Sequence, residues 1–232
     1  MNIQAAIAQV VAGQSLSRAD METVMRTVMQ GEATEAQIGG LLVALSMKGE
    51  TIDEIVGAAS VMRSLATPVD IDTDGLIDLA GTGGDGANLF NVSTAASFVV
   101  AGAGGRIAKH GNRSVSSSSG SSDVLSALGV DLSVSPAAIA DSIASIGVGF
   151  MFAPMHHSAM KHAIGPRQQL AMRTIFNVLG PLTNPAGARR QVLGVFSPAL
   201  CDVMASALRD LGSEHVMVVH GLDGLDEISV SA

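Results

Sequence analysis

The sequence contains few of the residues on which several classes of protein depend. Its 232 residues include one cysteine, Cys201, no tryptophan and no tyrosine, and aromatic residues make up 3%. A single cysteine cannot form an internal disulfide, which is consistent with a reducing cytosol, so we expect a cytoplasmic protein in which Cys201 is a small core residue. The scarcity of flat side chains argues against a stacking platform for single-stranded nucleic acid.

The chain also has few positively charged residues. The chain has 13 Lys and Arg against 21 Asp and Glu, and its net charge of -8 repels nucleic acids and anionic lipid surfaces at long range. The longest apolar stretch, around residues 98–101, is too short to span a bilayer, and the N-terminus lacks the pattern of a secretory signal. We therefore expect no nucleic-acid partner and no membrane partner. A phosphorylated ligand would have to be bound locally, by backbone amides, a few basic side chains or a metal.

The residues that are plentiful indicate a folded chain, since 47% are hydrophobic and only 15% are charged. Residues 1–67 predict helices only. Ser17, Thr34 and Thr51 each precede an apolar-periodic run as an N-cap, the last two with Gln or Glu three residues further on, as in a capping box.

Two glycines and several methionines lie within these predicted helices. Gly39 and Gly40 permit close contact between helices at some cost in helix propensity. Methionine at helical spacing is typical of an adaptable core or interface. Four methionines have this spacing: Met21, Met25, Met29 and Met47.

After Pro68 the pattern alternates between strands and helices. The apolar runs LIDLA, RIAKHG, VGFMFA, QVLGVF and HVMVVHG predict buried strands, with helices such as DVLSALG and PALCDVMASALRDLG between them. This order predicts an α/β fold with a mostly parallel sheet. We expect a small helical domain over residues 1–67 and an α/β domain over residues 73–232, with the segment around 165–185 packing with the helical domain. Ligands bind beyond the carboxyl ends of such strands.

A glycine-rich segment, GTGGDG at residues 81–86, directly follows the first predicted strand. Glycine lets the backbone approach a ligand closely and take positive φ angles, and amides ahead of a helix N-terminus suit a polyphosphate. The segment matches neither the dinucleotide fingerprint nor the P-loop, which carries a lysine. Alone, it is either a phosphate-binding loop or a tight structural turn. Asp85 suits ribose hydroxyls or a metal-bound water better than phosphate.

The next motif, NVST at residues 91–94, opens the following predicted helix. Ser93 or Thr94 is either an ordinary N-cap or part of a helix start whose hydroxyls and amides hold a phosphate. In the second interpretation Ser93 also reaches a magnesium ion. The position just after the glycine loop favours this second interpretation.

The third motif, KHGN at residues 109–112, ends the second predicted strand. Lys109 is well placed there to neutralise a leaving pyrophosphate. Residues 116–122 have the serine and glycine composition of a flexible linker. Because they lie between a strand and a helix of one sheet, they fit better as a loop that wraps an anion.

Together these motifs resemble the anthranilate phosphoribosyltransferases. GTGGD, N-x-S-T, K-H-G-N-R and G-S-x-D are similar in order and spacing to that family's site for phosphoribosyl pyrophosphate (PRPP), and MFAPMHHSAMK, RTIFNVLGPLTNP and DGLDEIS continue the match over essentially the whole chain. The resemblance implies transfer of the phosphoribosyl group of PRPP to the amine of anthranilate, in tryptophan biosynthesis. It also implies two Mg²⁺ ions per subunit, a homodimer through the N-terminal helices, and an α/β domain of the nucleoside phosphorylase/phosphoribosyltransferase type.

The resemblance also implies roles for matching residues. Lys109, Asn112 and Arg167 are the implied catalytic residues, with Asn112 and Arg167 as the pair that binds anthranilate. Ser93, Asp226 and Glu227 are the implied metal ligands. The implied substrate contacts, of which His110, His157 and Pro181 line the path of the aromatic acid, are Gly81, Gly84, Asp85, Leu89, Asn91, Val92, Ser93, Thr94, Lys109, His110, Gly111, Asn112, Arg113, Ser114, Val115, Ser116, Ser117, Ser121, His157, Arg167 and Pro181.

Physical chemistry leaves alternatives at some of these positions. Arg167 can pair with a carboxylate in a planar fork, or it is a solvated arginine at a helix start. His157 lines the site, or it is one of three surface histidines in MHHSAMKH. Asp226 and Glu227 are adjacent oxygen donors suited to a magnesium ion shared with pyrophosphate, although any acidic loop has a similar composition.

The sequence departs from the family pattern in three places. Leu89 stands where the family usually has threonine, and Ser118 stands where many members have lysine, so we expect weaker PRPP binding with the same reaction. Family members also continue beyond the position of Ala232. From this we expect weak binding and slow turnover by the 232-residue chain, and full activity in a version extended by the missing family segment.

Two other functions remain open at this point. A nucleoside phosphorylase of the same architecture would bind a nucleoside and free phosphate, although its signature differs at KHGN. A nucleic-acid-binding paralogue of the same fold would need a basic surface, which the charge balance disfavours.

Overall fold

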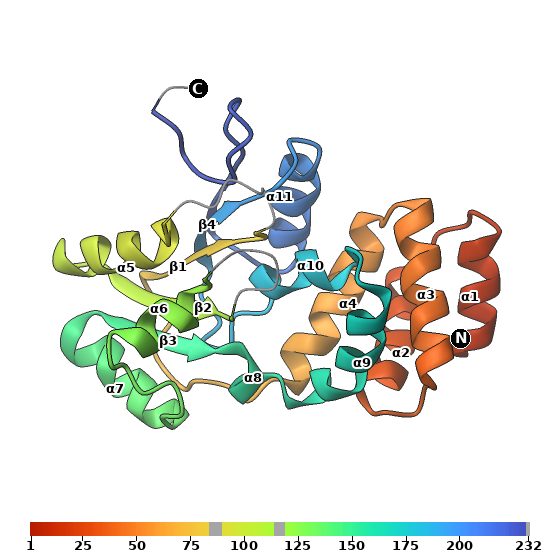
Figure 1. Ribbon diagram of the computed structural model, residues 1–232, viewed down its shortest axis with the longest axis horizontal. Helices are drawn as coiled ribbons and strands as arrows, with labels where there is room; N and C mark the ends of the chain where they lie inside the picture. The colour runs from red at the N-terminus through yellow and green to blue at the C-terminus, as the bar shows by residue number, and fades with distance from the viewer. Residues whose placement is uncertain (84–89, 114–118, 231–232) are drawn as a thin grey trace. The chain divides into compact units, whose positions relative to one another are not determined.

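The structure is a computed structural model that describes residues 1–83, 90–113 and 119–230 (Figure 1). It divides into two compact units. The helical unit consists of Met1–Ala66 and His157–Thr183, and the sheet unit consists of Thr67–His156 and Asn184–Ala232. The chain therefore leaves the helical unit, builds the first part of the sheet unit, and returns before it completes the sheet.

The helical unit combines four N-terminal helices with a later segment. The N-terminal helices are α1 (Ile3–Val11), α2 (Arg18–Met29), α3 (Glu35–Lys48) and α4 (Ile52–Leu65). The later segment contributes the 3₁₀ turn η1 (Ser158–Met160), α9 (Lys161–Leu170), α10 (Phe176–Leu179) and the 3₁₀ turn η2 (Gly180–Leu182).

The predicted starts of three N-terminal helices are confirmed. The side chains of Ser17, Thr34 and Thr51 each accept a hydrogen bond from the backbone N–H three residues on, and the last two form complete capping boxes. Glu54, the third residue of α4, is fully buried and accepts hydrogen bonds from the backbone N–H of Leu16 and from Nζ of Lys48, both at 2.9 Å. A buried carboxylate with this many partners fixes the start of α4 against the rest of the unit.

The methionines are divided between the core and the surface. Met21, Met25 and Met29 line the buried face of α2, where the core interpretation is confirmed, whereas Met47 is 83% exposed at the end of α3. Met47 therefore contributes nothing to the core of the helical unit.

The glycine that brings two helices close together is Gly57, which the sequence analysis did not single out. A Cβ at position 57 in α4 would lie 2.7 Å from the carbonyl oxygen of Arg18 and 3.1 Å from Cβ of Met21. At Gly40 a Cβ would make one ordinary contact, 3.9 Å from Ile7, and at Gly39 nothing lies within 4 Å. The expectation of close packing was therefore wrong for Gly39.

This difference predicts opposite effects of the same substitution. Gly57→Ala is expected to lower the free energy of unfolding by about 1–3 kcal/mol, because the backbone of α2 cannot yield as a flexible side chain would. Gly39→Ala, a matched control, is expected to raise it by about 0.5–1 kcal/mol, since alanine has the better helix propensity and meets no neighbour. Urea unfolding of both variants measures the difference, and equal shifts would contradict the packing described here.

The sheet unit is built on five parallel strands in the order β3-β2-β1-β4-β5. The strands are β1 (Leu76–Gly81), β2 (Arg106–Gly111), β3 (Val148–Phe152), β4 (Arg190–Gly194) and β5 (His215–Val219). The helices are α5 (Val92–Gly102), α6 (Ser121–Ala127), α7 (Pro136–Ile146), α8 (Ala153–His156) and α11 (Leu200–Asp210). All five predicted strands and the parallel sheet are thus confirmed.

Helices pack against this sheet as the alternation of elements predicts (Figure 1). Ile139 and Ile143 of α7 join Leu76, Ala108 and Met151 of the first three strands in a buried apolar cluster. On the other side of β1 in the strand order, α11 packs against β5. Cys201 of α11 is half-buried rather than a core residue, so that expectation was wrong.

Strand order reverses at β1, which positions the site. From β1 the chain passes through α5 to the neighbouring β2, whereas β4 lies on the other side of β1 and passes through α11 to β5. Loops that leave two adjacent strands in opposite directions open a crevice between them at the carboxyl ends, where ligands of such sheets bind. In this sheet that position is between β1 and β4.

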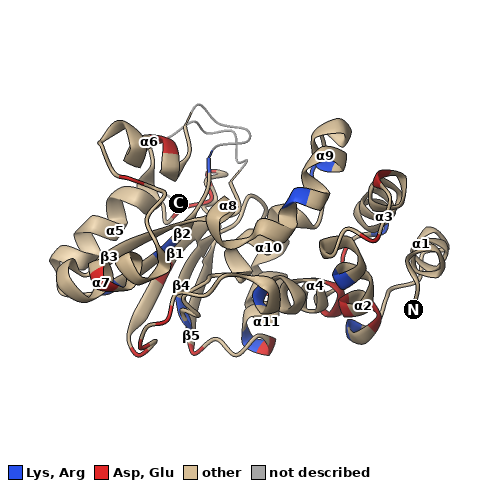
Figure 2. Ribbon diagram, turned by 90° about the horizontal axis from the view of Figure 1, so that it is seen from below, with Lys and Arg blue, Asp and Glu red and all other residues tan. Residues whose placement is uncertain are grey.

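Charged residues of both signs lie at the opposite, amino ends of the strands (Figure 2). Asp72 and Asp74, just before β1, form ion pairs with Arg106 and Arg190 at the starts of β2 and β4. These pairs are exposed and contribute little to stability. No helix in the described part of the chain is long and apolar enough to cross a membrane.

Candidate active site

The glycine loop begins at the carboxyl end of the central strand. Gly81 ends β1, the N–H of Thr82 donates to the carbonyl oxygen of Gly194 in β4 at 2.9 Å, and Gly83 takes a φ of +63°. This start of the loop is therefore tied to β4 at the point where strand order reverses. Gly84, Asp85 and Leu89, which were also predicted to contact substrate, lie outside the described residues.

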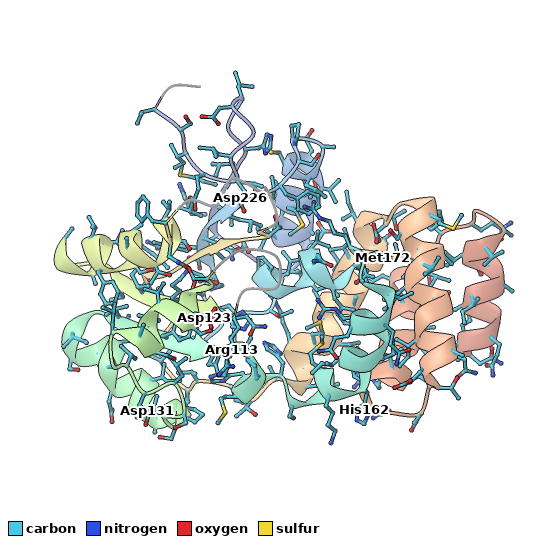
Figure 3. All side chains as sticks on the ribbon, viewed as in Figure 1. Arg113, Asp123, Asp131, His162, Met172 and Asp226 are labelled. Atoms are coloured by element: carbon cyan, nitrogen blue, oxygen red, sulfur yellow. The ribbon has the colours of Figure 1, made fainter. Side chains whose placement is uncertain are left out.

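Asp226 packs directly onto this turn (Figure 3). Its Oδ2 accepts a hydrogen bond from the N–H of Gly83 at 3.1 Å, and a Cβ at Gly81 would lie 3.1 Å from the same oxygen. At Gly194 a Cβ would lie 1.7 Å from the carbonyl oxygen of Asp226, so no other residue fits there. The acidic loop after β5 is therefore in direct contact with the start of the glycine loop after β1.

The start of α5 contributes hydroxyls that do not cap the helix. Asn91 is the N-cap residue, and its side chain donates to Oγ of Ser119 at 3.1 Å instead of capping α5. The N-cap interpretation of Ser93 and Thr94 is therefore wrong, because both lie inside α5, which begins at Val92. Oγ1 of Thr94 is buried and has no hydrogen-bond partner among the described residues, which is the condition of a hydroxyl that a ligand would satisfy.

Lys109 is the central cation of the site. Its side chain is 3% exposed, and its Nζ donates to the carbonyl oxygen of Leu79 and, at 3.0 Å, to Oγ of Ser93. Burial lowers the pKa of Lys109 to about 8, while the negative charges of Asp78 and Glu227 act in the opposite direction. Lys109, Ser93 and the acidic loop are therefore close enough to act on one ligand.

Asp78 is a member of this cluster that the sequence analysis missed. It lies within the apolar run of β1, is 1% exposed, and its Oδ1 accepts from the N–H of His110 at 3.2 Å. Burial raises the pKa of Asp78, and the positive charge of Lys109 lowers it. The only signal in the sequence was an acidic residue inside a predicted buried strand, where charge requires a partner.

The loop after β2 carries the predicted residues His110 to Arg113. His110 is buried, and Gly111 leaves room for the ring of Phe150, since a Cβ there would lie 2.7 Å from that ring. Asn112 and Arg113 are exposed, and the Arg113 guanidinium lies 5.9 Å from the centre of the Phe152 ring. The predicted residues Ser114, Val115, Ser116 and Ser117 lie outside the described part of the chain, as does Ser118.

Further along, Ser121 begins α6 behind this loop. The next hydroxyl, Oγ of Ser122, is buried without a hydrogen-bond partner in the ranges that the structure describes. The backbone N–H of Gly120 donates a hydrogen bond to Oδ2 of Asp123 at 2.7 Å. The start of α6 therefore adds a second unsatisfied buried hydroxyl to that of Thr94, and both lie beside predicted PRPP contacts in sequence.

The remaining predicted residues, His157, Arg167 and Pro181, belong to the helical unit. Arg167 lies in the last turn of α9, half-buried, with its guanidinium 5.1 Å from the centre of the Phe176 ring. Burial lowers the pKa of Arg167, and in the described ranges its guanidinium has no ion pair and no hydrogen bond. The interpretation as a solvated arginine at a helix start was wrong. His157 and Pro181 are buried, so the surface interpretation of His157 was wrong as well.

The acidic loop fits a magnesium ion that is shared with substrate phosphates, and in the described part of the chain it does not form an enclosed metal site by itself. Within the described residues no group of three or more His, Cys, Asp or Glu could enclose a metal. Mg²⁺ is commonly bound through one or two carboxylates together with substrate phosphates and water. Asp226 at the glycine loop and Glu227, whose charge acts on Lys109, fit that second arrangement, in which the metal arrives with a polyphosphate.

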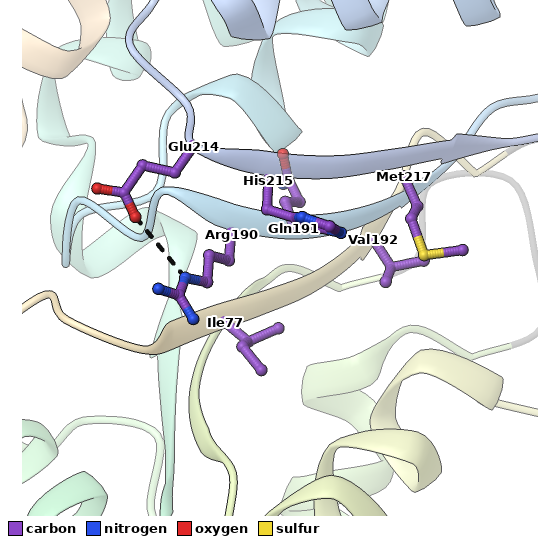
Figure 4. Close-up of a pocket in the computed structure, with 7 residues that line it drawn as sticks. All are labelled: Ile77, Arg190, Gln191, Val192, Glu214, His215 and Met217. Carbon is purple, nitrogen blue, oxygen red and sulfur yellow. Dashed lines mark ion pairs between the residues drawn. The ribbon is translucent and has the colours of Figure 1, made fainter.

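A pocket of about 560 Å³ on the sheet unit is lined by none of the candidate site residues (Figure 4). It is lined at the amino-terminal half of the strands by Ile77, Arg190, Gln191, Val192, Glu214, His215 and Met217. None of these was predicted to bind substrate, and ligands of parallel sheets bind at the other edge. We therefore place the site at the carboxyl ends, where the buried cation, the paired carboxylates and the unsatisfied hydroxyls are found.

Known protein families match most of the chain. Residues 4–66 match the helical bundle domain of a glycosyl transferase family, and residues 73–232 match its a/b domain. A relative from Teredinibacter turnerae, an anthranilate phosphoribosyltransferase, is 68% identical over all of this chain and 68% of its own length. The anthranilate phosphoribosyltransferase of Cellvibrio japonicus is 67% identical over all of this chain and 67% of its own length.

Two solved structures are similar to this chain over nearly all of its length. Anthranilate phosphoribosyltransferase from Thermus thermophilus matches 96% of this chain and 67% of its own, with a TM-score of 0.90 and 47% identity. The enzyme from Saccharomyces cerevisiae in complex with PRPP and Mg matches 98% of this chain and 68% of its own, with a TM-score of 0.89 and 31% identity.

Proposed function

The chain belongs to the anthranilate phosphoribosyltransferases, and on that premise we propose that it transfers the phosphoribosyl group of PRPP to the amine of anthranilate and releases pyrophosphate, as a step of tryptophan biosynthesis. The observation that carries the proposal is the position of Lys109, a buried cation at the carboxyl edge of the sheet between Ser93 and the acidic loop. The relatives do not favour a nucleoside phosphorylase or a nucleic-acid-binding paralogue.

The reaction breaks the bond between the anomeric carbon of ribose and pyrophosphate. Pyrophosphate leaves with the bonding electrons, the nitrogen of anthranilate forms the new bond, and the nitrogen then loses a proton. Negative charge develops on the leaving group, so a fixed cation beside it lowers the barrier. Lys109 is that cation in our proposal, and its bonds to Leu79 and Ser93 fix its direction before substrate arrives.

Magnesium is the metal that the yeast complex supports, and we propose that two ions bind per subunit. Asp226 and Glu227 would hold one and Ser93 would contact the other. When bound, the metal supplies further positive charge to the departing pyrophosphate. Within the chain, the N–H of Gly83 holds the Asp226 carboxylate in place at the glycine loop.

Anthranilate needs orientation more than activation, because its amine is already a neutral nucleophile. We propose that Arg167 binds the carboxylate of anthranilate in a planar fork and that Asn112 contributes to the same recognition. The surroundings of Arg167 support a role in binding the carboxylate. Its guanidinium is half-buried, stacks on Phe176 and has no ionic partner in the described residues. His110, His157 and Pro181 are proposed to line the path of the ring.

The acidic pair should control the magnesium requirement. The double variant Asp226→Asn, Glu227→Gln is expected to need about tenfold more Mg²⁺ for half-maximal turnover, because outer and direct metal contacts typically contribute roughly 10- to 100-fold. Asp223→Asn is the matched control, since Asp223 lies in the same loop and bonds Ser229 instead. Turnover measured against Mg²⁺ concentration decides, and an unchanged requirement in the double variant would remove the pair from the site.

We also propose a homodimer built on the N-terminal helices. Val11 of α1 is 72% exposed and Met47 of α3 is 83% exposed, so these two helices present apolar side chains that the helical unit does not use. Light scattering at micromolar concentration is expected to give the mass of two chains, and Met47→Glu is expected to shift it toward one. A monomer in the unaltered protein would contradict the proposal.

A cytoplasmic location stays a prediction.

A further inference from the structure

The ladder between β1 and β2 is unusually short. It pairs Leu76 with Arg106 and Ile77 with Ile107 and then stops, whereas the ladders between β1 and β4 and between β2 and β3 each run over five pairs. The central strand thus leaves β2 while it stays paired with β4. The break begins at Asp78 and extends toward the carboxyl edge, where the proposed pyrophosphate site lies.

Two charged side chains bridge the strands where the ladder has stopped. In a regular parallel pair, main-chain N–H and C=O groups bond each other directly. Here the N–H of His110 in β2 donates to the carboxylate of Asp78 in β1, at 3.2 Å. In the other direction, the carbonyl of Leu79 in β1 accepts from Nζ of Lys109 in β2. Asp78 and Lys109 therefore replace main-chain bonds in a reciprocal arrangement.

The carboxylate of Asp78 is held from the side of β4 as well. Its Oδ2 accepts from Nε2 of Gln191 in β4 at 3.4 Å, and the side chain of Asn184 lies near enough to lower the pKa of Asp78. Nδ2 of Asn184 further donates to the carbonyl oxygen of Ala108 in β2 at 2.9 Å. Asp78, in β1, is thus bonded to β2 through His110 and to β4 through Gln191.

A buried carboxylate is a costly way to join three strands. Burying an ion is expensive, and apolar residues of similar volume often serve equally well for stability alone. A charge at this position is better explained by what it does for its neighbours. It balances Lys109 within the sheet and keeps the end of β2 at a fixed separation from β1.

We propose that Asp78 is a positioning residue of the transfer reaction. Its carboxylate holds the main chain of His110 at the end of β2, and its negative charge acts on the ammonium of Lys109, so that both keep the geometry that receives the pyrophosphate of PRPP. Asp78 does not touch substrate; it acts through Lys109 and the end of β2. The inference rests on the proposed function, and its test separates the two.

The test compares the unaltered chain with Asp78→Asn, which keeps the size of the side chain and removes its charge. Calorimetry with inorganic pyrophosphate and Mg²⁺ measures binding without turnover. The variant is expected to bind pyrophosphate roughly 10- to 100-fold more weakly and to lose a similar factor in kcat/KM for PRPP, while KM for anthranilate changes less than about threefold. Gln191→Met, which removes one donor to the carboxylate, is expected to lose a smaller factor in the same direction.

Two controls distinguish positioning from a loss of stability. Glu54→Gln removes a buried carboxylate that also faces a lysine, but in the helical unit, and is expected to lower the melting temperature without changing pyrophosphate binding. In a Lys109→Met background, Asp78→Asn is expected to have no further effect on pyrophosphate binding, since it acts through Lys109.

The outcomes are separable. If the unaltered chain binds pyrophosphate and Asp78→Asn or Gln191→Met binds it equally well, the positioning role is overturned and the proposed function stands. Additive losses in the double variant would also overturn it. If the unaltered chain neither binds pyrophosphate nor consumes PRPP, the proposed function fails and the inference fails with it.

Discussion

Replacing Lys109 by methionine is expected to lower kcat/KM for PRPP by roughly 10²- to 10³-fold, most of it in kcat. Removing one preoriented group that stabilises developing charge typically has an effect of this size. Methionine fills a similar volume, so the space between β1, β2 and α5 stays occupied while the charge is lost. The KM for anthranilate is expected to stay within about threefold, because Lys109 acts on the leaving group.

Lys48→Met is the matched control for this result. Lys48 is also a largely buried lysine with a carboxylate partner, Glu54 at 2.9 Å, but it lies in the helical unit. We expect this variant to melt at a lower temperature and to keep the PRPP kinetics of the unaltered chain. If Lys109→Met turned over at the unaltered rate, or lost no more than Lys48→Met, Lys109 would not be the cation that stabilises pyrophosphate.

The second large effect is expected at Arg167, on the other substrate. Arg167→Ala should raise KM for anthranilate roughly 10- to 150-fold, as expected for loss of a charged hydrogen-bonded pair of about 1.5–3 kcal/mol. The KM for PRPP should change less than about threefold. Steady-state kinetics with each substrate varied in turn measures both constants.

Arg167→Lys provides the internal control for geometry. Lysine keeps the charge but lacks the planar fork, so it should recover only part of the loss. Because Arg167 also stacks on Phe176, Arg167→Ala could destabilise the helical unit, and this effect must be distinguished from a loss of anthranilate binding. Phe176→Leu removes the stacking alone, and thermal melts report its effect on the helical unit. Equal increases in both Michaelis constants for Arg167→Ala would contradict the assignment to anthranilate.

Much of the fold followed from the sequence because local signals agreed with the final packing. The capping boxes at Thr34 and Thr51 each form as their spacing predicts, and each apolar run after Pro68 became a strand of one parallel sheet. These features depend on neighbouring residues along the chain. The close contact at Gly57 could not be found this way, because it depends on the backbone of α2, more than thirty residues earlier.

The loops of the candidate site could be predicted from the sequence. The residues that hold these loops in place could not be predicted as well. The motifs around Gly81, Ser93 and Lys109 stood out by composition and lie where parallel sheets bind ligands. Asp78 did not stand out, since one acidic residue in LIDLA leaves the apolar pattern intact. Its role appears only when the β1–β2 ladder is seen to stop beside it. Arg167 has no ionic partner in the described residues, which sequence cannot show because it depends on every surrounding element.

The decisive experiment follows the fluorescence of anthranilate in the presence of the purified chain, PRPP and Mg²⁺, together with an assay for released pyrophosphate. We expect fluorescence to fall only when PRPP and Mg²⁺ are both present, pyrophosphate to appear in equal amount, and Lys109→Met to abolish most of both signals. Consumption of PRPP that left anthranilate unchanged, or loss of fluorescence without pyrophosphate, would contradict the proposed function.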